Sequence, residues 1–495
     1  MRNFKHTEDQ PRWIFKKHTN NMNLLLEVAT YLKNNKSNIS IEDKERMFDI
    51  LSNKDNYNPR KSLRNKPLDS LNHRLDELRY YMFGYYDKID GVDKFMFSPL
   101  GNLFLKNILS DSQENMEKIF LTMLYAVQFP HIGSQPSWEN FSLYPFRLMI
   151  KLLREPQLGY KLYHSEVVMI LMFVQKMNDT KSYNDLVSDI IELRNRGYEY
   201  IFNELLANQF YYVTLVYEWE YYVSVLLAEA GVIIKRYDGK EKFVKLAHKQ
   251  KIGSKSPATF RKATNGFFEL NSSLVPLADE LLEKYTIFDL PLMLDDCKSL
   301  SSDIVKEIYS FYPKELLISI GEEVDDSLLE LLSLPKLIEQ YSKNENNKTS
   351  DLFEDVLVEA FNLFINVEAE KRSGAGQTDI ECLFIPLKEI FAVEAKSTQN
   401  KLSLINAGRL RKHRNQIGAR YTVLVTPRYV PSVKYDIQGQ EIVIIKANTL
   451  SEYFYNGIIS KTRELDYSEF REIITNNLGT DISRHISELT LSKFG

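Results

Sequence analysis

The apolar run Ile390 to Lys396, which carries two charged side chains near its end, constrains the fold of this 495-residue chain most strongly. The segment before it, Ile380 to Phe384, alternates apolar and other side chains, and a short loop from Pro386 to Glu389 joins the two. Both segments have the length and pattern of β-strands, so we predict a hairpin. Because side chains of a strand alternate between its faces, Glu394 and Lys396 share one face.

Asp379 opens the first predicted strand, directly after a glycine-rich turn that contains Gly374 and Gly376. Two carboxylates and an ammonium at the end of a buried sheet are costly to desolvate without a counter-ion. Carboxylate oxygens suit Mg²⁺, and a neighbouring lysine can position or deprotonate a water. The segment therefore predicts a hydrolytic metal site. The alternative is an edge strand whose charges face water, because Glu-x-Lys is a common pattern in a chain with 26% charged residues.

A helix is expected from Asp351 onward, because apolar residues recur there at helical spacing. Glu354 lies at the border of this apolar stripe, where its side chain could reach the sheet. Alternatively, Asp351 and Glu354 form a capping box at the start of the helix. The stripe consists of Phe353, Val356, Leu357, Ala360, Phe361 and Phe364.

This arrangement of acids and lysine resembles the active-site motif of the PD-(D/E)XK nuclease superfamily. The resemblance implies that Asp379 and Glu394 hold one or two Mg²⁺ ions, with the backbone carbonyl of Ala395 as a further metal ligand. It also implies that Lys396 acts on the attacking water or on the scissile phosphate. Glu354 corresponds to the acidic helix residue of the family and completes the expected catalytic set.

Two features beside the motif bear on this resemblance. Thr378 stands where the family usually has a proline, which weakens the motif but removes no chemistry, because proline has no group to contribute. A basic helix follows the motif and leads into a strand from Tyr421 to Val425, and the family places such a helix against the DNA backbone. The alternative is a solvated basic helix face. Its cations are Lys401, Arg409, Arg411, Lys412, His413, Arg414 and Arg420, of which Arg409 and Lys412 are the candidate DNA contacts.

Composition limits the class of protein. The length suits three or four domains, and 44% hydrophobic residues are enough for each domain to form a buried hydrophobic core. The two cysteines form no disulfide framework, and no signal peptide is evident. Glutamates interrupt the apolar run Tyr211 to Ile234, which predicts a buried helix rather than a membrane span. We expect a soluble, cytoplasmic prokaryotic protein.

The net charge of −4 conceals a segregation of charge along the chain. Ten Lys and Arg residues lie between Lys235 and Lys262 against two acids, and six lie between Lys54 and Arg74 against two. The stretch from Asp279 to Glu330 is acidic. Because phosphate binding depends on local cations, the basic segments predict a nucleic-acid partner in spite of the total charge.

The N-terminal part predicts three helices followed by a two-stranded wing. The helices are expected over 20–32, 40–51 and 68–78, the second one capped by Ser40 and Asp43. An aromatic hairpin from Tyr80 to Phe97 turns at Asp90-Gly91. This order is typical of a helix-turn-helix variant whose third helix enters the major groove. The alternative is a helical bundle whose basic side chains are exposed to solvent and do not contact DNA. The candidate DNA contacts are Arg60, Lys61, Arg64, Lys66, Asn72 and Arg74.

A second module of this kind is expected further along the chain. Its helices are predicted over 142–153, 164–177, 182–196 and 276–284, and strands 260–262 and 266–270 are predicted to pair through a turn at Asn265-Gly266. The segment Lys249 to Lys255 is interpreted either as a phosphate-contacting loop or as a solvated linker. The candidate DNA contacts are Lys249, Lys251, Lys255, Arg261 and Lys262.

The whole arrangement resembles type IIS restriction endonucleases, nearest to the AlwI-like and nicking-enzyme branch and more distantly to FokI-like enzymes. Short matches support this over most of the chain: 12–15, 99–102, 129–130, Trp138 and 145–148. Trp13 and Trp138 are nevertheless interpreted as core residues. The expected fold is multidomain: winged-helix-like DNA-recognition subdomains at 1–140 and 141–285, an acidic helical linker at 286–345, and an α/β PD-(D/E)XK nuclease domain with a central mixed sheet at 346–495.

The resemblance implies that the protein binds a short asymmetric sequence in double-stranded DNA. It would then hydrolyse phosphodiester bonds at a fixed distance with Mg²⁺, leaving 5′-phosphate ends. Cutting both strands would need a transient homodimer or a second subunit, and a cognate DNA methyltransferase is an expected partner. The alternatives are a nicking endonuclease, a DNA-binding regulator with an inactive nuclease fold, and a structure-specific repair or resolvase nuclease.

Overall fold

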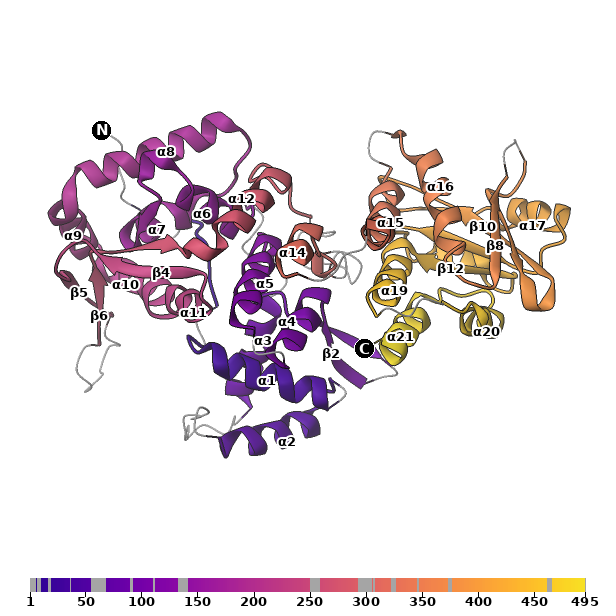
Figure 1. Cartoon of the computed structure of the whole chain (residues 1–495), viewed down its shortest axis with the longest axis horizontal. Coiled ribbons are helices and arrows are strands. Elements are labelled where there is room, and N and C mark those ends of the chain that lie inside the picture. Colours follow the sequence, from indigo (N-terminus) through magenta and orange to yellow (C-terminus); the bar gives the residue numbers. More distant parts are fainter. Residues whose placement is uncertain are drawn as a thin grey trace. The chain divides into compact units, whose positions relative to one another are not determined.

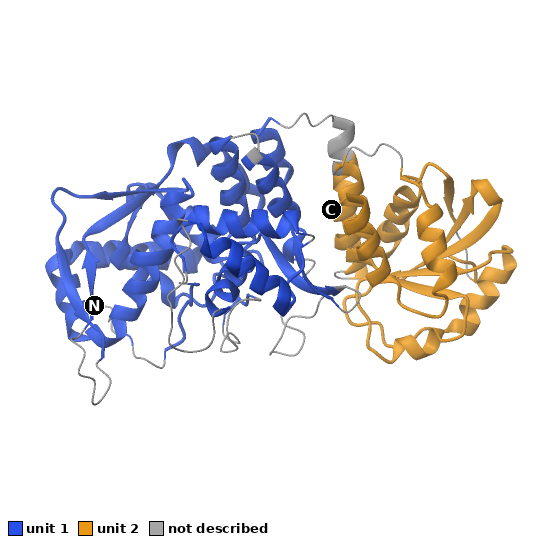
Figure 2. Cartoon of the chain, turned by 90° about the horizontal axis from the view of Figure 1, so that it is seen from below, with its two compact units in different colours: residues 1–322 blue, residues 323–495 orange. Residues whose placement is uncertain are grey.

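The computed structural model divides the chain into two compact units, residues 1–322 and 323–495 (Figure 2). It describes residues 6, 10–16, 19–35, 37–54, 68–89, 92–109, 112–131, 141–249, 259–292, 305, 308–321, 326–344, 347–372, 376–460 and 465–494. The boundary between the units falls inside the stretch expected to be a linker. Each unit has its own core and is described by itself below.

Unit 1 begins with the expected three helices and hairpin. Helices α1 (Met22–Asn34), α2 (Ile41–Ser52) and α3 (Asp69–Tyr80) precede strands β1 (Gly84–Ile89) and β2 (Val92–Phe97), which pair antiparallel. The Asn21 and Ser40 side chains accept hydrogen bonds from the backbone N–H groups of Leu24 and Asp43, so both caps follow from the residue types. The order of elements agrees with the prediction, and the winged-helix interpretation stays a prediction.

Helices α4 (Pro99–Leu109), α5 (Gln113–Ala126) and α6 (Pro145–Leu153) continue unit 1. Trp13 is completely buried, and its indole N–H donates to the carbonyl of Val174 at 2.7 Å. The interpretation of Trp13 as a core residue is therefore confirmed, whereas Trp138 lies outside the described residues. Arg147 is also buried; its guanidinium donates to the Tyr125 carbonyl at 2.7 Å and to Asp289 at 2.8 Å, which compensates its charge.

The next helices are α7 (His164–Met169), α8 (Thr180–Asn195), α9 (Gly197–Ala207), α10 (Gln209–Glu218) and α11 (Ser224–Glu229), with one π-helical turn at Trp219–Val223. The predicted helix 164–177 is wrong beyond Met169. The chain there pairs with other segments instead: Trp13 N–H donates to the Met172 carbonyl and Ser142 N–H to the Gln175 carbonyl. None of the described helices is long and apolar enough to cross a membrane.

Unit 1 holds two further small sheets. Strand β7 (Gly266–Leu270) lies between β3 (Lys161–Tyr163) and β4 (Ile233–Tyr237), while β5 (Phe243–Ala247) pairs with β6 (Phe260–Thr264). The predicted pairing of 260–262 with 266–270 is therefore wrong. The strand β7 pairs with two neighbouring strands and its apolar side chains are buried, whereas Asn265 hydrogen-bonds Lys242 and so belongs to the β5–β6 ladder. Helices α12 (Val275–Lys284) and α14 (Lys314–Ser319) close the unit.

Unit 2 is built on a mixed five-stranded sheet, as predicted. The strand order is β12–β11–β10–β9–β8, with β8, β9 and β10 antiparallel and β10, β11 and β12 parallel. The strands are β8 (Val367–Lys371), β9 (Ile380–Phe384), β10 (Glu389–Ala395), β11 (Thr422–Thr426) and β12 (Ile442–Lys446).

Helices cover both faces of this sheet (Figure 1). The larger core joins one face to α15 (Asp326–Ser342), α16 (Ser350–Phe361), α19 (Ala447–Ile459), α20 (Ser468–Asn476) and α21 (Ser483–Phe494). The smaller core joins the opposite face to α17 (Ala407–Gln416) and α18 (Val433–Ile437). The predicted apolar stripe of α16 is buried in the larger core, together with Leu334 and Ile338 of α15.

Glu220, in the π-helical turn of unit 1, is a buried carboxyl whose protonation is linked to folding. It is 8% exposed and accepts hydrogen bonds from the backbone N–H and the hydroxyl of Thr264. Burial raises the pKa of Glu220 from 4.5 to about 8. Between these two values the folded protein binds a proton that the unfolded chain has already lost, so the free energy of unfolding falls as the pH rises.

We therefore expect the wild type to lose stability by about 1 kcal/mol per pH unit from this group between a pH of about 6 and about 8. Glu220→Gln keeps the shape of the side chain without the titration and should have a flatter profile. Chemical denaturation across this pH range measures both slopes. Glu283→Gln, on the exposed side of α12, serves as the control and should keep the wild-type slope. Identical slopes for wild type and Glu220→Gln would contradict the linkage.

Candidate active site and DNA-contact residues

The antiparallel register of β9 and β10 brings Asp379 and Glu394 together. Ile380 pairs with Val393, so continuing the ladder by one residue places Asp379 opposite Glu394. Ile380 and Val393 point into the larger core, and alternation therefore turns both acids toward the opposite face, the one covered by α17. The carboxylate of Asp379 accepts a hydrogen bond of 2.8 Å from the backbone N–H of Ala395, which holds it at the end of β10.

Lys396 joins the two acids. Its ammonium donates to Oε1 of Glu394 and lies 3.8 Å from Oδ2 of Asp379. The side chain of Lys396 is 37% exposed, whereas Glu394 is almost completely buried. Lys396 therefore reaches both the buried acid and the surrounding solvent.

Glu394 is a buried carboxyl whose charge is only partly compensated. Its second oxygen, Oε2, is buried and has no hydrogen-bond partner among the described residues. Burial raises the pKa of Glu394, and the neighbouring Asp379 raises it further, while Lys396 acts in the opposite direction. A buried carboxylate oxygen without a partner is costly, and a hard cation at this place would satisfy it.

Glu354 lies beside this centre but belongs to α16, which packs in the larger core on the opposite face of the sheet. Its carboxylate is 3.3 Å from the ammonium of Lys371 on β8, and burial followed by the charge of Asp379 raises its pKa. The capping-box alternative for Glu354 is wrong: Thr349, not Asp351, precedes the helix as its cap, and no side-chain capping bond is formed. Lys371 also contacts Asp355 at 2.7 Å. The sequence reasoning missed Lys371, because a lone lysine at the end of a strand carries no signal.

Helix α17 faces the acids with part of its basic surface. The charges of Asp379 and Lys396 influence the pKa of His413, which burial lowers, and the charge of Arg409, one turn earlier, influences that of Glu394. His413 is buried, and within the described part of the chain its Nδ1 has no hydrogen-bond partner. Arg414 instead points away, pairing with Glu441 at 2.7 Å. The basic residues of α17 are thus not all solvated, and their role in DNA binding stays a prediction.

The candidate metal ligands are few. Among the described residues, no three His, Cys, Asp or Glu side chains are grouped so that they could hold a metal ion. The pair Asp379 and Glu394 would therefore need a ligand from the backbone, such as the carbonyl of Ala395, or from water. Mg²⁺ accepts such sets because it usually keeps several waters.

Several predicted DNA contacts lie outside the described part of the chain: Arg60, Lys61, Arg64, Lys66, Lys251 and Lys255. Asn72 and Arg74 lie on α3, where the Arg74 guanidinium is 3.6 Å from the carboxylate of Glu77. Lys249 follows β5 and is exposed. Lys262 is exposed on β6, but its neighbour Arg261 packs inward, with its guanidinium 4.3 Å from the ring centre of Tyr217.

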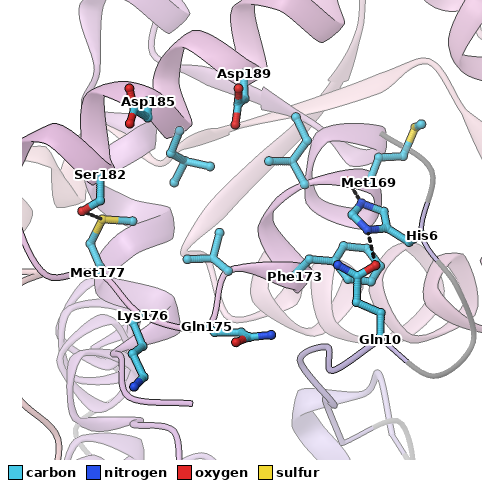
Figure 3. Close-up of a pocket in the computed structure, with 13 residues that line it drawn as sticks. His6, Gln10, Met169, Phe173, Gln175, Lys176, Met177, Ser182, Asp185 and Asp189 are labelled. Carbon is cyan, nitrogen blue, oxygen red and sulfur yellow. Dashed lines mark hydrogen bonds between the residues drawn. The ribbon is translucent and has the colours of Figure 1, made fainter. Parts of the chain in front are cut away.

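A pocket of about 560 Å³ opens in unit 1 (Figure 3). His6 stacks on Phe173 and forms a hydrogen bond of 2.7 Å with the carbonyl of Met169. The two carboxylates of the pocket, Asp185 and Asp189, follow one another along α8 (Figure 3). Lys176 also lines the pocket and is drawn apart from the two acids in Figure 3, whereas Lys396 contacts both acids in unit 2. The candidate active site is therefore the cluster in unit 2.

Comparisons with known proteins address the family. The model of the N-terminal domain of type II restriction endonuclease HgaI matches residues 7–285. The type II restriction enzyme HgaI of Avibacterium volantium is 53% identical over 488 residues, which cover 98% of each protein.

Among solved structures, the BpuJ1 endonuclease binding domain in complex with modified DNA is 16% identical, with a TM-score of 0.36 over 61% of this chain and 96% of that one. Restriction endonuclease FokI is 11% identical, with a TM-score of 0.25 over 95% of this chain and 99% of that one. Scores of this size support no detail of the fold, and the placement near AlwI-like enzymes stays a prediction. The family match and the 53% identity, in contrast, show that this chain belongs to the HgaI family of type II restriction endonucleases.

Proposed function

We propose that this protein is a type IIS restriction endonuclease that hydrolyses double-stranded DNA with Mg²⁺ at a centre formed by Asp379, Glu394 and Lys396. The observation that carries the proposal is the convergence of the three side chains, with Lys396 between the acids and one buried oxygen of Glu394 unpartnered. The 53% identity to a type II restriction enzyme over almost the full length supports the same conclusion.

The residues present fit a divalent cation. Asp379 and Glu394 would hold it through carboxylate oxygens, and the carbonyl of Ala395 would add a third protein ligand. When bound, the cation neutralises charge on the phosphate in the transition state and lowers the pKa of the attacking water. Asp379 is already oriented for this role by the hydrogen bond from the N–H of Ala395.

Lys396 would position the water and stabilise charge on the phosphate. Its ammonium is held by Glu394 and is also partly exposed, so it can contact a group that arrives from solvent. Glu354 would support the centre from α16, where Lys371 compensates its charge. Arg409 and Lys412 on the basic helix α17 would contact the phosphates of the DNA strand, since cations are needed where a polyanion approaches two acids.

In the proposed organisation, DNA recognition and DNA cleavage are carried out by different parts of the chain. Winged-helix-like subdomains at 1–140 and 141–285 would recognise an asymmetric sequence, and the nuclease domain would cut at a fixed distance and leave 5′-phosphate ends. The assignment of 286–345 to a linker needs one amendment, because α15 supplies Leu334 and Ile338 to the core of unit 2. Since one centre cuts one strand, double-strand cleavage would need a transient homodimer or a second subunit. A cytoplasmic location and a cognate DNA methyltransferase complete the proposal.

Substitutions at the centre test the chemistry. Asp379→Ala and Lys396→Ala should each lower the rate of plasmid cleavage at least about 100-fold, the loss typical when one stabilising group of a transition state is removed. Glu381→Ala is the matched control, because it removes a carboxylate two residues further along β9 that pairs with Arg372 at 3.0 Å. Gel analysis of supercoiled, nicked and linear plasmid measures the rates.

The products of this assay separate the alternatives. Linear plasmid supports double-strand cutting, whereas an accumulation of nicked circles supports a nicking enzyme. Undiminished cutting by Asp379→Ala would remove this centre from the mechanism, and a wild type that binds DNA without cutting it would favour the inactive-nuclease regulator.

Removal of the metal tests the cofactor. Chelation of divalent cations with EDTA should stop cleavage, and added Mg²⁺ should restore it, because Lys396 compensates only part of the charge of the two acids, which would still repel the phosphate. Isothermal titration with Mg²⁺ in the absence of DNA should detect binding to the wild type and weaker binding to Asp379→Ala. Cleavage that persists in EDTA would exclude the metal-assisted reaction.

Run-off sequencing of the cleaved ends tests the type IIS assignment. A constant offset from one short asymmetric sequence is expected, because the reader and the nuclease lie on one chain. Ends that follow branched or distorted DNA, with no common sequence, would instead identify a structure-specific nuclease.

A further inference from the structure

The β5–β6 hairpin of unit 1 places two lysines directly opposite each other. In its antiparallel register, Lys245 pairs with Lys262, Phe243 with Thr264, and Ala247 with Phe260. Residues that pair in this way lie on the same face of the hairpin, so both lysines share that face with Phe243 and Phe260. Both lysines are exposed, and the phenylalanines are 42% and 52% exposed.

The charge on this face is not compensated. Neither strand contains an acid, and among the described residues no carboxylate forms an ion pair with Lys245 or Lys262. The ammonium of Lys262 lies over the Phe243 ring at 4.1 Å. The nearby acids are engaged or precede the strands: Glu220 accepts from Thr264, and Glu241 lies before β5. Like charges opposite each other destabilise a sheet, so an anionic partner would relieve a cost that the free protein bears.

The opposite face of the hairpin is fixed to the helices. Leu246 and Ala263 are buried there, and β5 and β6 pack against α9 and α10 (Figure 1). The backbone N–H of Ala247 donates to Gln209 at 3.0 Å, and that of Lys262 donates to the hydroxyl of Tyr221 at 2.8 Å. Arg261 is part of this anchorage, since its guanidinium lies against Tyr217 and Tyr221. The two lysines are therefore presented by an anchored element rather than by a loop.

We propose that the outward face of this hairpin is a phosphate clamp for duplex DNA, in which Lys245 and Lys262 grip one backbone phosphate. Phe243 and Phe260 would pack against the neighbouring sugar or base edges, which explains large apolar side chains beside unpaired cations. One phosphate offers several acceptor oxygens, and side chains directly opposite across a ladder are close enough to share it. The proposal rests on the DNA-binding function proposed above. It assigns Arg261 to the hairpin's anchorage rather than to DNA.

The clamp makes a prediction that separates binding from stability. Lys245→Gln combined with Lys262→Gln should weaken binding by roughly tenfold at about 0.1 M salt and lower the slope of log K against log salt by about 0.9, the counter-ion release of one phosphate contact. The melting temperature without DNA should stay the same or rise, because the opposed charges are gone. The probe is one fluorescently labelled duplex DNA fragment, the same for every variant and chosen without reference to cleavage, in EDTA, measured by fluorescence anisotropy.

Controls make the result specific. Lys181→Gln removes one exposed lysine of α8 in the same unit, and Lys245→Arg with Lys262→Arg keeps both charges; both proteins should bind like the wild type. Phe260→Ala should weaken binding with little change in the salt slope, since it removes an apolar contact. Affinity and slope of the double Gln variant equal to those of Lys181→Gln would overturn the clamp. Plasmid cleavage by the wild type is measured separately. Its absence would contradict the proposed nuclease activity alone, whereas the anisotropy measurement tests whether the hairpin contacts a DNA phosphate.

Discussion

The contact of Lys396 with two carboxylates at the end of the β9–β10 hairpin is the interaction on which the proposed function depends. Asp379 and Glu394 repel each other and Glu394 is buried, and the ammonium of Lys396, which contacts both carboxylates, compensates part of this charge. Among the described residues, Oε2 of Glu394 has no hydrogen-bond partner, and this is the observation that the proposed cation would satisfy.

The register of one ladder decides whether this contact forms. Ile380, Cys382, Phe391 and Val393 point into the larger core, and a slip by one residue would bury the acids there and expose the apolar side chains. Burying the acids and exposing these apolar side chains would cost free energy, so the observed register is favoured. This register in turn places Asp379 and Glu394 side by side. The parallel partner β11 adds Leu424 beside Glu394, so the same face continues into the smaller core under α17. The geometry of the proposed centre is thus a consequence of two apolar cores of different size on the two faces of one sheet.

The proposed centre of unit 2 and the β5–β6 hairpin of unit 1 differ in how their cations are compensated. In unit 2, the described cations near the centre mostly have acids beside them: Lys371 contacts Glu354 and Asp355, and Arg414 contacts Glu441. On the β5–β6 hairpin of unit 1, two lysines oppose each other with no acid in either strand. Cations that are paired with nearby acids are expected around the proposed metal site, where several carboxylates lie close together. Cations without an acid beside them are expected on a surface that binds a polyanion such as DNA.

The sequence by itself determined the helix and strands around the proposed centre and the residue types that the β9–β10 hairpin brings together. Periodicity located α16 and its buried stripe, alternation located β9 and β10, and the spacing of Asp379, Glu394 and Lys396 indicated which side chains would share a face. These features are local, since they follow from the repeat of a helix or a strand. Only the tertiary structure decided the partners. The sequence predicted that β6 and β7 pair with each other, yet they belong to different sheets. The helix that begins at His164 ends at Met169, because backbone carbonyls after Met169 accept hydrogen bonds from distant segments of the chain. The inward turn of Arg261, the pairing of Lys371 with Glu354 and the burial of His413 arise from contacts between residues far apart in the chain, and no local pattern encodes them.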